Sequence, residues 1–307
     1  MKCSYLEFVF RPEIYASTFY VFLAVTHVLC GIVSSGLNSL VIWTIWKVPA
    51  LHKPSMVLIA GLALKDLCMG IMVEPLYTAW IITAHKAESF ELFCALGVIG
   101  KDLLYSLSTL AGFNITAISI DRCLAIRTKA NYRNIVTLKR VVRFLIFCWI
   151  SSFTICIPLA FESKRTAFRV VAVLGVIFFV VSKTSYILSI LAIRKLRNQV
   201  SQKPEVHAES AERKANFDIS KYSRSLRTLV IVFCCDVVFY CPLISIGIFR
   251  SIGAKISENN WALYLSVCEM LMLLPSTVNP CIFLWRMQDL RQEAKNILKG
   301  LLKRGET

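Results

Sequence analysis

Seven long apolar stretches constrain this sequence more than any other feature. They lie near residues 17–46, 55–84, 95–125, 141–161, 167–193, 226–250 and 261–285. Each is long enough to cross a membrane core of roughly 30 Å. Charges within them are sparse and there is no run of short alternating strands, so each stretch is predicted to be a helix that satisfies its own backbone hydrogen bonds. With 56% hydrophobic residues among 307, the chain is too apolar for a water-soluble domain.

The basic residues indicate how the helices are oriented. If the N-terminus lies outside, the inner segments carry about three times as many Lys and Arg residues as the outer ones. The formal net charge of +16 is divided among short loops, so it indicates attraction to inner-leaflet lipids and cytosolic proteins rather than to nucleic acid.

We therefore predict a single domain over residues 1–307, located in the plasma membrane as a multi-pass protein with its N-terminus outside. Its parts outside the spans are an outer N-terminus (1–16), a flexible third inner loop (198–220) and an amphipathic helix with a short tail (286–307).

Each apolar stretch also carries a short motif, and the motifs occur in a fixed order. They are Gly36–Val41, Leu62–Leu67, Ile120–Ile126, Trp149 with Pro158, Tyr186, Tyr240–Pro242 and Asn279–Phe283. Together they resemble the rhodopsin class (class A) of G-protein-coupled receptors over nearly the whole chain. The resemblance implies an all-α fold: a seven-transmembrane helix bundle plus a short amphipathic helix on the inner leaflet.

The resemblance also implies a switch at the inner end of the third helix. Arg122 would sit where the membrane core meets the cytosol, and Asp121 would neutralise it at rest. When the inner ends of the helices part, Arg122 would release Asp121 and face the G protein. The other switch residues implied are Asn279, Pro280, Phe283 and Tyr186. The alternative is a boundary arginine that has no switching role.

Polar residues near the middle of the membrane form a second implied site. Asn38, Asp66 and Asn279 would be costly there without partners, and Ser276 could join them. In the resembling family such residues meet around waters, often with a sodium ion, and Na⁺ is the only cofactor we consider. Two departures stand beside this site: Ala111 occupies a position that usually adds a hydroxyl, and Lys65 next to Asp66 has no explanation from the sequence.

The expected ligand pocket lies among the outer halves of the helices. Its candidate residues are Glu74, Lys101, Asp102, Tyr240 and Glu269, each of which could equally be a solvated rim residue. The three carboxylates would form an acidic mouth that favours a cationic ligand group or a divalent ion. Leu104 replaces the aspartate of amine receptors and Leu273 the lysine of opsins, so neither of these binding modes is expected.

The second outer loop, about 162–167, is short and contains no cysteine. In this respect it resembles the melanocortin and adenosine-like branches of the family. Cys94 would then be free, or would pair with Cys3 or Cys156. A further hypothesis pairs Lys183 with Asp236 between the fifth and sixth helices.

The predicted function is that of a receptor that couples an extracellular small-molecule or peptide ligand to heterotrimeric G proteins, with arrestin and membrane lipids as further candidate partners. An enzyme is not expected, because the four histidines form no catalytic or metal-binding set. A transporter is disfavoured because no inverted repeat is seen. Since Phe283 stands where the family usually has tyrosine, a constitutively active or weakly coupling orphan receptor remains the alternative.

Overall fold

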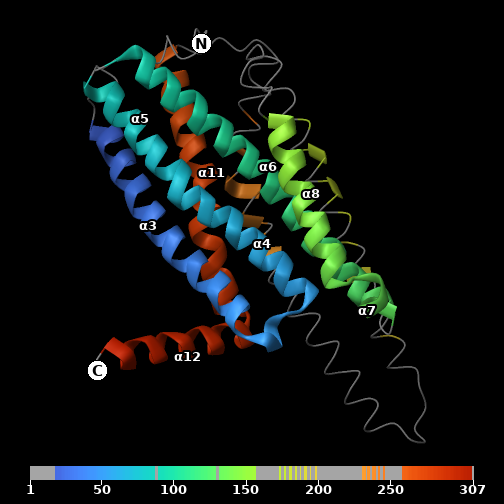
Figure 1. Cartoon of the computed structure of the whole chain (residues 1–307). Coiled ribbons are helices and arrows are strands. Elements are labelled where there is room, and N and C mark those ends of the chain that lie inside the picture. The colour runs from blue at the N-terminus through green and yellow to red at the C-terminus, as the bar shows by residue number, and fades with distance from the viewer. Residues whose placement is uncertain are drawn as a thin grey trace, which may run out of the picture.

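The structure is a bundle of long helices that run side by side, with one further helix lying across an end of the bundle (Figure 1). The computed structural model describes residues 18–86, 89–128, 131–156 and 258–305, together with single positions between 173 and 245. Its long helices are α3 (Thr18–Lys47), α4 (Pro54–Cys68), α5 (Glu74–Lys86), α6 (Phe90–Thr128), α8 (Leu138–Cys156), α11 (Glu258–Arg286) and α12 (Gln288–Gly305). Short helical turns also occur at η1 (Pro49–Leu51), η2 (Met69–Val73) and α7 (Tyr132–Ile135).

Within the described ranges, four helical stretches are long and apolar enough to cross a membrane. They are Thr18–Lys47, Pro54–Lys86, Phe90–Ala125 and Leu263–Arg286. These coincide with the first, second, third and seventh apolar stretches of the sequence. The helix α8 covers the described part of the fourth stretch, and most of the fifth and sixth stretches lies outside the described residues.

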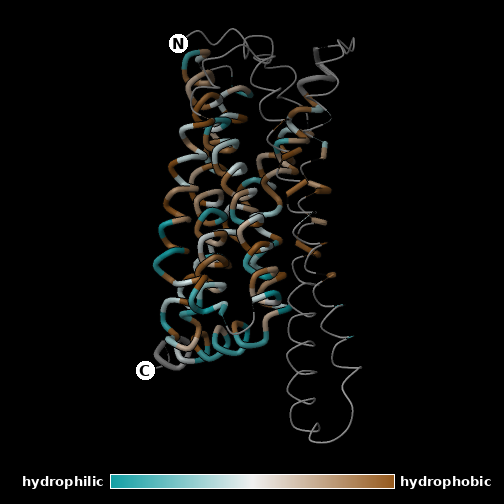
Figure 2. The backbone as a smooth tube through the Cα atoms, turned by 90° about the vertical axis from the view of Figure 1, so that its right-hand side faces the viewer, coloured by the Kyte–Doolittle hydropathy of each residue, from teal (hydrophilic) through white to brown (hydrophobic). Residues whose placement is uncertain are grey.

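The surface of the bundle is apolar, whereas polar side chains lie inside it. Phe22 and Ile32 on α3 and Phe147 on α8 are all more than half exposed. In contrast, Asn38 and Asp66 are completely buried. Such an arrangement suits lipid rather than water, because lipid carries no penalty for exposed apolar side chains. Figure 2 shows hydrophobic residues along the length of the bundle, and hydrophilic residues gathered toward the end where α12 lies.

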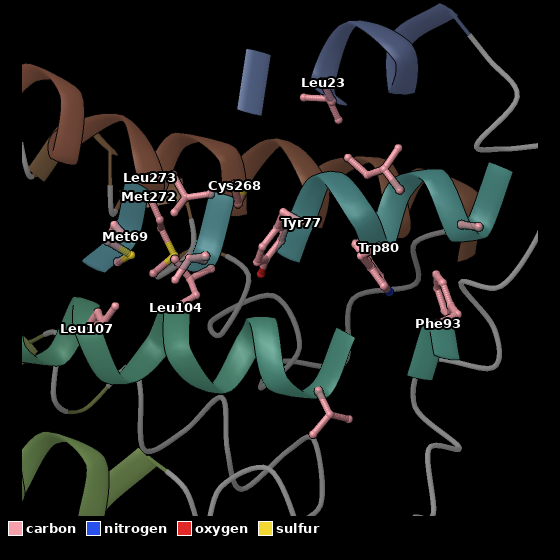
Figure 3. Packing of buried hydrophobic residues seen from close by; sticks show 14 of the residues in the cluster. Leu23, Met69, Tyr77, Trp80, Phe93, Leu104, Leu107, Cys268, Met272 and Leu273 are labelled. Carbon is pink, nitrogen blue, oxygen red and sulfur yellow. The ribbon is translucent and has the colours of Figure 1, made fainter. Parts of the chain in front are cut away.

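Two clusters of hydrophobic side chains fill the bundle, one toward each end. The cluster near α12 includes Leu62, Phe283 and Leu290. The other cluster, part of which is drawn in Figure 3, includes Trp80 stacked on Phe93 with ring centroids 5.1 Å apart. Below, the end of the bundle that holds the first cluster is called the α12 end, and the end that holds the second cluster is called the opposite end.

The second membrane stretch is not one regular α-helix. Helix α4 passes into α5 through η2, a single wide π-helical turn. A π turn interrupts the regular i→i−4 hydrogen bonding and is often found near functional sites. The sequence predicted a continuous helix over 55–84, because hydrophobicity alone carries no sign of one extra residue in a turn.

Two glycines allow α3 to approach this second stretch closely. A Cβ atom on Gly70 would lie 2.7 Å from Ser35 Oγ and 3.0 Å from the carbonyl oxygen of Gly31. A Cβ atom on Gly31 would lie 3.1 Å from both the carbonyl oxygen of Gly70 and Cβ of Glu74. Small residues at such a crossing let two membrane helices pack backbone to backbone.

Helix α12 begins two residues after α11 ends and lies across the end of the bundle (Figure 1). Leu290 and Ala294 on α12 are buried, whereas Lys295 and Lys299 are exposed. One face is therefore apolar and packed, and the other is charged. This is the helix that the sequence predicted within residues 286–307.

Candidate functional site

An acidic and a basic side chain meet near the C-terminal end of α6, which lies at the α12 end of the bundle (Figure 1). Arg122 Nη2 is 3.4 Å from Asp121 Oδ2, and the two side chains are 17% and 3% exposed. Because the pair is neutral overall, it can occupy a mostly buried position at the membrane boundary at lower cost than either charge alone.

The Asp121 carboxylate has a second partner, which the sequence did not suggest. The hydroxyl of Tyr132, on the short helix α7, donates a hydrogen bond of 2.5 Å to Asp121 Oδ1. The two carboxylate oxygens are thus held by residues from different helices. The only signal available in the sequence was a tyrosine in the polar segment that follows the Asp-Arg pair.

A polar cluster lies in the middle of the bundle, where α3, α4 and α11 meet. Ser34 Oγ is 3.1 Å from the backbone oxygens of both Asp66 and Ser276. Asn38 Nδ2 donates to the backbone oxygen of Ser276 at 2.9 Å. Asn279 Nδ2 donates to Asp66 Oδ2 at 3.2 Å. The structure therefore brings together the four residues that the sequence predicted here, and it adds Ser34.

Two details of this cluster differ from expectation. Ser276 contributes its backbone oxygen, because its hydroxyl donates to the backbone oxygen of Leu273 at 2.6 Å. Ser34 lies one helical turn before Asn38 and accepts a hydrogen bond from Asn38 Nδ2 at 3.2 Å. A serine on the same helix face as a buried asparagine was a signal that the sequence offered and that was not used.

Lys65, which the sequence left unexplained, belongs to the same cluster. Its side chain is 1% exposed, and its Nζ forms an ion pair with Asp66 Oδ1. Asp66 is therefore held on one oxygen by Lys65 and on the other by Asn279. The adjacent lysine and aspartate form a buried pair with no net charge.

Two buried acid–base pairs lie toward the opposite end of the bundle. Lys101 Nζ on α6 is 2.6 Å from Glu269 Oε1 on α11. His27 Nδ1 on α3 is 2.6 Å from Glu74 Oε2 at the start of α5. Each pair connects two helices, and none of the four side chains is more than 7% exposed.

Aromatic residues support the Lys101–Glu269 pair. Lys101 Nζ lies 5.1 Å from the ring centroid of Trp80, within the range of a cation–π interaction. The hydroxyl of Tyr105 donates a hydrogen bond of 3.4 Å to Glu269 Oε1. The pair that joins α6 to α11 is thus also contacted by one side chain from α5 and one from α6.

The sequence predicted that Glu74, Asp102 and Glu269 form an acidic mouth. This prediction is wrong for Glu74 and Glu269, because each has a basic partner. His27 was missed, although a histidine inside an apolar span usually needs a partner. Each glutamate keeps one buried oxygen that receives no hydrogen bond from the described residues, Oε1 in Glu74 and Oε2 in Glu269. Asp102 is half-buried and forms no ion pair with any described side chain.

The remaining predicted residues divide into two groups. Pro280 and Phe283 are buried on α11, and Phe283 packs in the cluster near the α12 end. Tyr186, Tyr240 and the hypothesised Lys183–Asp236 pair lie outside the described residues, as do the N-terminus 1–16 and the third inner loop beyond residue 198.

Cys94 is in a disulfide bond. Cys156 is a free thiol. Two of the three possibilities raised by the sequence, a free Cys94 and a Cys94–Cys156 bridge, are therefore wrong. The partner of Cys94 is not among the described residues.

Residues 37–283 of the chain match the family described as 7 transmembrane receptor (rhodopsin family). The chain belongs to the rhodopsin family of seven-transmembrane receptors. This match confirms both the resemblance to class A G-protein-coupled receptors and the helical-bundle fold.

The relatives of this rhodopsin-family receptor include adenosine and serotonin receptors. It is 30% identical to adenosine receptor A3 of Bos taurus over 142 residues, which are 46% of this chain and 41% of the relative. Against adenosine receptor A2a of Canis lupus familiaris the identity is 23%, over 88% of this chain and 70% of the relative. Against 5-hydroxytryptamine receptor 1B of Vulpes vulpes it is 29%, over 54% of this chain and 41% of the relative. The matches thus span about two fifths of the A3 and 1B receptors.

Proposed function

We propose that this receptor converts binding of an extracellular ligand into activation of a heterotrimeric G protein at the plasma membrane. In this proposal the α12 end faces the cytosol and the opposite end, together with the N-terminus, faces outside. The observation that carries the proposal is the contact between Asp121 and Arg122 at the cytosolic lip of the bundle, 3.4 Å between Oδ2 and Nη2. Arg122 is partly exposed there, so it can reach a protein that binds at this end.

The proposed switch is a change of partner by Arg122. At rest, Asp121 holds Arg122, and Tyr132 holds Asp121. A ligand that favours an arrangement with parted inner helix ends frees the guanidinium, which then contacts the G protein. Ligand binding can bias these two arrangements only to the extent that it binds one more tightly than the other.

Helix α11 is the proposed connection between the two ends. Glu269 on α11 pairs with Lys101 near the outside, and Asn279 on the same helix contacts Asp66 in the middle of the bundle. Two prolines, Pro275 and Pro280, lie within this helix and remove backbone donors, which permits a bend. A ligand that breaks or strengthens the outer ion pair would therefore shift α11 against its neighbours.

The proposed ligand is a small molecule or peptide that presents hydrogen-bond donors to the two glutamates. Oε1 of Glu74 and Oε2 of Glu269 are buried acceptors without donors among the described residues, and the other oxygen of each glutamate already has a basic partner. Hydrogen bonding, rather than a bare cation, is therefore the interaction that this end can offer. Adenosine, which is uncharged, is therefore the first ligand to test, because relatives are named for it.

The test is nucleotide exchange on G proteins in membranes that contain the full chain. We expect added ligand to raise exchange above that of control membranes, and we expect Arg122→Ala to abolish this rise at equal surface expression. Arg143→Ala is the matched control, because this exposed arginine on α8 donates, among the described residues, only to the nearby backbone oxygen of Lys139. Equal exchange with Arg122→Ala and the unchanged receptor would reject the switch.

A second candidate, a constitutively active or weakly coupling receptor, is favoured by one residue. Phe283 is buried at the α12 end and, unlike the tyrosine that the family usually has there, it has no hydroxyl to form a hydrogen bond. The same exchange assay, run without ligand, distinguishes this case: high exchange without ligand that Arg122→Ala removes supports constitutive activity.

A further inference from the structure

The Asp66 carboxylate is enclosed in the bundle and already carries a cation that belongs to the chain. Its side chain is 0% exposed and that of Lys65 is 1%. Lys65 Nζ pairs with Asp66 Oδ1, while Asn279 Nδ2 donates to Asp66 Oδ2. A buried carboxylate is tolerated when a positive charge and hydrogen-bond donors occupy its oxygens. Both oxygens of Asp66 meet this requirement without an ion from solution.

A sodium ion, which the family resemblance suggested for this cluster, does not fit these residues. It would have to share Asp66 with the Lys65 ammonium, so two positive charges would face one negative charge away from water. Asn38 Oδ1 and Asn279 Oδ1 receive no hydrogen bond from described residues. Amide oxygens can coordinate a cation, but they carry no net charge, so they would not neutralise a second cation beside Lys65. The buried side chain of Ala111 adds no oxygen.

We propose that the Lys65 ammonium is a tethered replacement for sodium at Asp66, and that this receptor is insensitive to sodium at its central polar cluster. A covalently attached cation has a local concentration that does not depend on the salt in solution. The link from α4 through Asp66 to Asn279 on α11 is therefore held at every sodium concentration. The proposal depends on family membership for the comparison with sodium, and it does not depend on G-protein coupling.

The first test compares the purified full chain in equal concentrations of sodium, potassium and choline chloride. We expect the thermal unfolding midpoint of the unchanged receptor to be the same in all three salts. A higher midpoint in sodium chloride, lost in Asp66→Asn, would overturn the proposal. Unfolding is measured without a G protein, so this outcome is independent of whether the receptor couples.

A second test removes the tethered charge. In Lys65→Met the side chain keeps a similar length but Asp66 loses its cation, so the midpoint should fall by several degrees in potassium chloride. Sodium chloride should restore part of that loss, and the double variant Lys65→Met with Asp66→Asn should respond to neither salt. A Lys65→Met receptor that folds and gains no sodium response would also overturn the proposal.

Lys101→Met is the matched control, because it removes another buried lysine from an ion pair in the same bundle. Its midpoint should fall equally in all three salts. If Lys65→Met does not fold, the line width of the sodium NMR signal in the presence of the unchanged receptor decides the matter. A line width equal to that with Asp66→Asn supports the proposal, and broadening that Asp66→Asn removes overturns it.

Discussion

The hydroxyl of Tyr132 donates a hydrogen bond of 2.5 Å to Asp121 Oδ1. This bond joins α7, in the segment between α6 and α8, to the carboxylate that contacts Arg122. The position of that segment and the state of the arginine are therefore linked by one side chain.

Replacing Tyr132 by phenylalanine should raise signalling in the absence of ligand by roughly tenfold. Hydrogen bonds to charged groups contribute about 1.5–3 kcal/mol, and about 1.4 kcal/mol changes an equilibrium tenfold. Asp121→Asn should have a larger effect, because it also removes the charge that holds Arg122. Nucleotide exchange per surface receptor measures both, and Tyr20→Phe at the opposite end is the hydroxyl-loss control. Unchanged exchange in Tyr132→Phe would show that α7 does not restrain the switch.

Replacing only one residue of the Lys101–Glu269 pair should destabilise the receptor more than replacing both. Lys101→Met leaves Glu269 buried and charged without its cation, which typically costs about 3–5 kcal/mol. In the double variant Lys101→Met with Glu269→Gln, no charge remains to be compensated, so part of the stability should return. Thermal unfolding of the four proteins gives the coupling between the two residues. Strictly additive effects would mean that the 2.6 Å contact contributes nothing.

Gly70→Ala should destabilise the packing of α3 against the second membrane stretch by about 1–3 kcal/mol. The added Cβ would lie 2.7 Å from Ser35 Oγ and 3.0 Å from a backbone oxygen, and backbone cannot easily move aside. Gly36→Ala is the matched control on α3, because no atom other than its chain neighbours and the nearby backbone of its own helix lies within 4 Å of the Cβ it would add. The unfolding midpoint should fall for the first variant and hold or rise for the second. Equal midpoints would contradict the close helix approach.

Cys94→Ser should lower the unfolding midpoint, and reductant should lower that of the unchanged receptor similarly. A disulfide typically contributes about 2–4 kcal/mol by restricting the unfolded chain. Cys156→Ser is the comparison, because Cys156 is free and its replacement should leave the response to reductant intact. Peptide mapping without reduction should find Cys94 in a cross-linked peptide. Alkylation of Cys94 in the folded, unreduced receptor would contradict this prediction.

The sequence predicted the first, second, third and seventh membrane stretches, which the described residues bear out, because hydrophobic length depends on composition alone. It also selected Asn38, Asp66 and Asn279, since polar residues inside apolar helices are rare and stand out. It could not predict which atoms of these residues meet. Ser276, for example, participates through its backbone oxygen, which depends on the exact rotation of α11.

Pairings between helices were the least predictable part. Glu74, Glu269 and Lys101 were all selected as pocket residues, but not as partners. The pairings depend on the relative rotation and depth of the helices, which no local pattern specifies. The pairing of Lys65 was hard to predict for a different reason. Its partner is its neighbour in the sequence, yet adjacent helical residues normally point apart, and only the length of the lysine side chain lets Nζ reach Asp66.

The wide turn η2 separates the second membrane stretch into two helical segments, α4 and α5. The number of residues in the turn sets how far α5 is rotated about the helix axis relative to α4. One residue more or less in a helix rotates everything beyond it by about 100°. Lys65 and Asp66 lie before that turn, and Glu74 lies directly after it. A single insertion or deletion at Met69–Val73 would therefore rotate Glu74, which we propose to contact the ligand, away from His27, while the Lys65–Asp66 pair stayed in place. The length of this one turn thus sets the direction of every side chain on α5 without affecting those on α4.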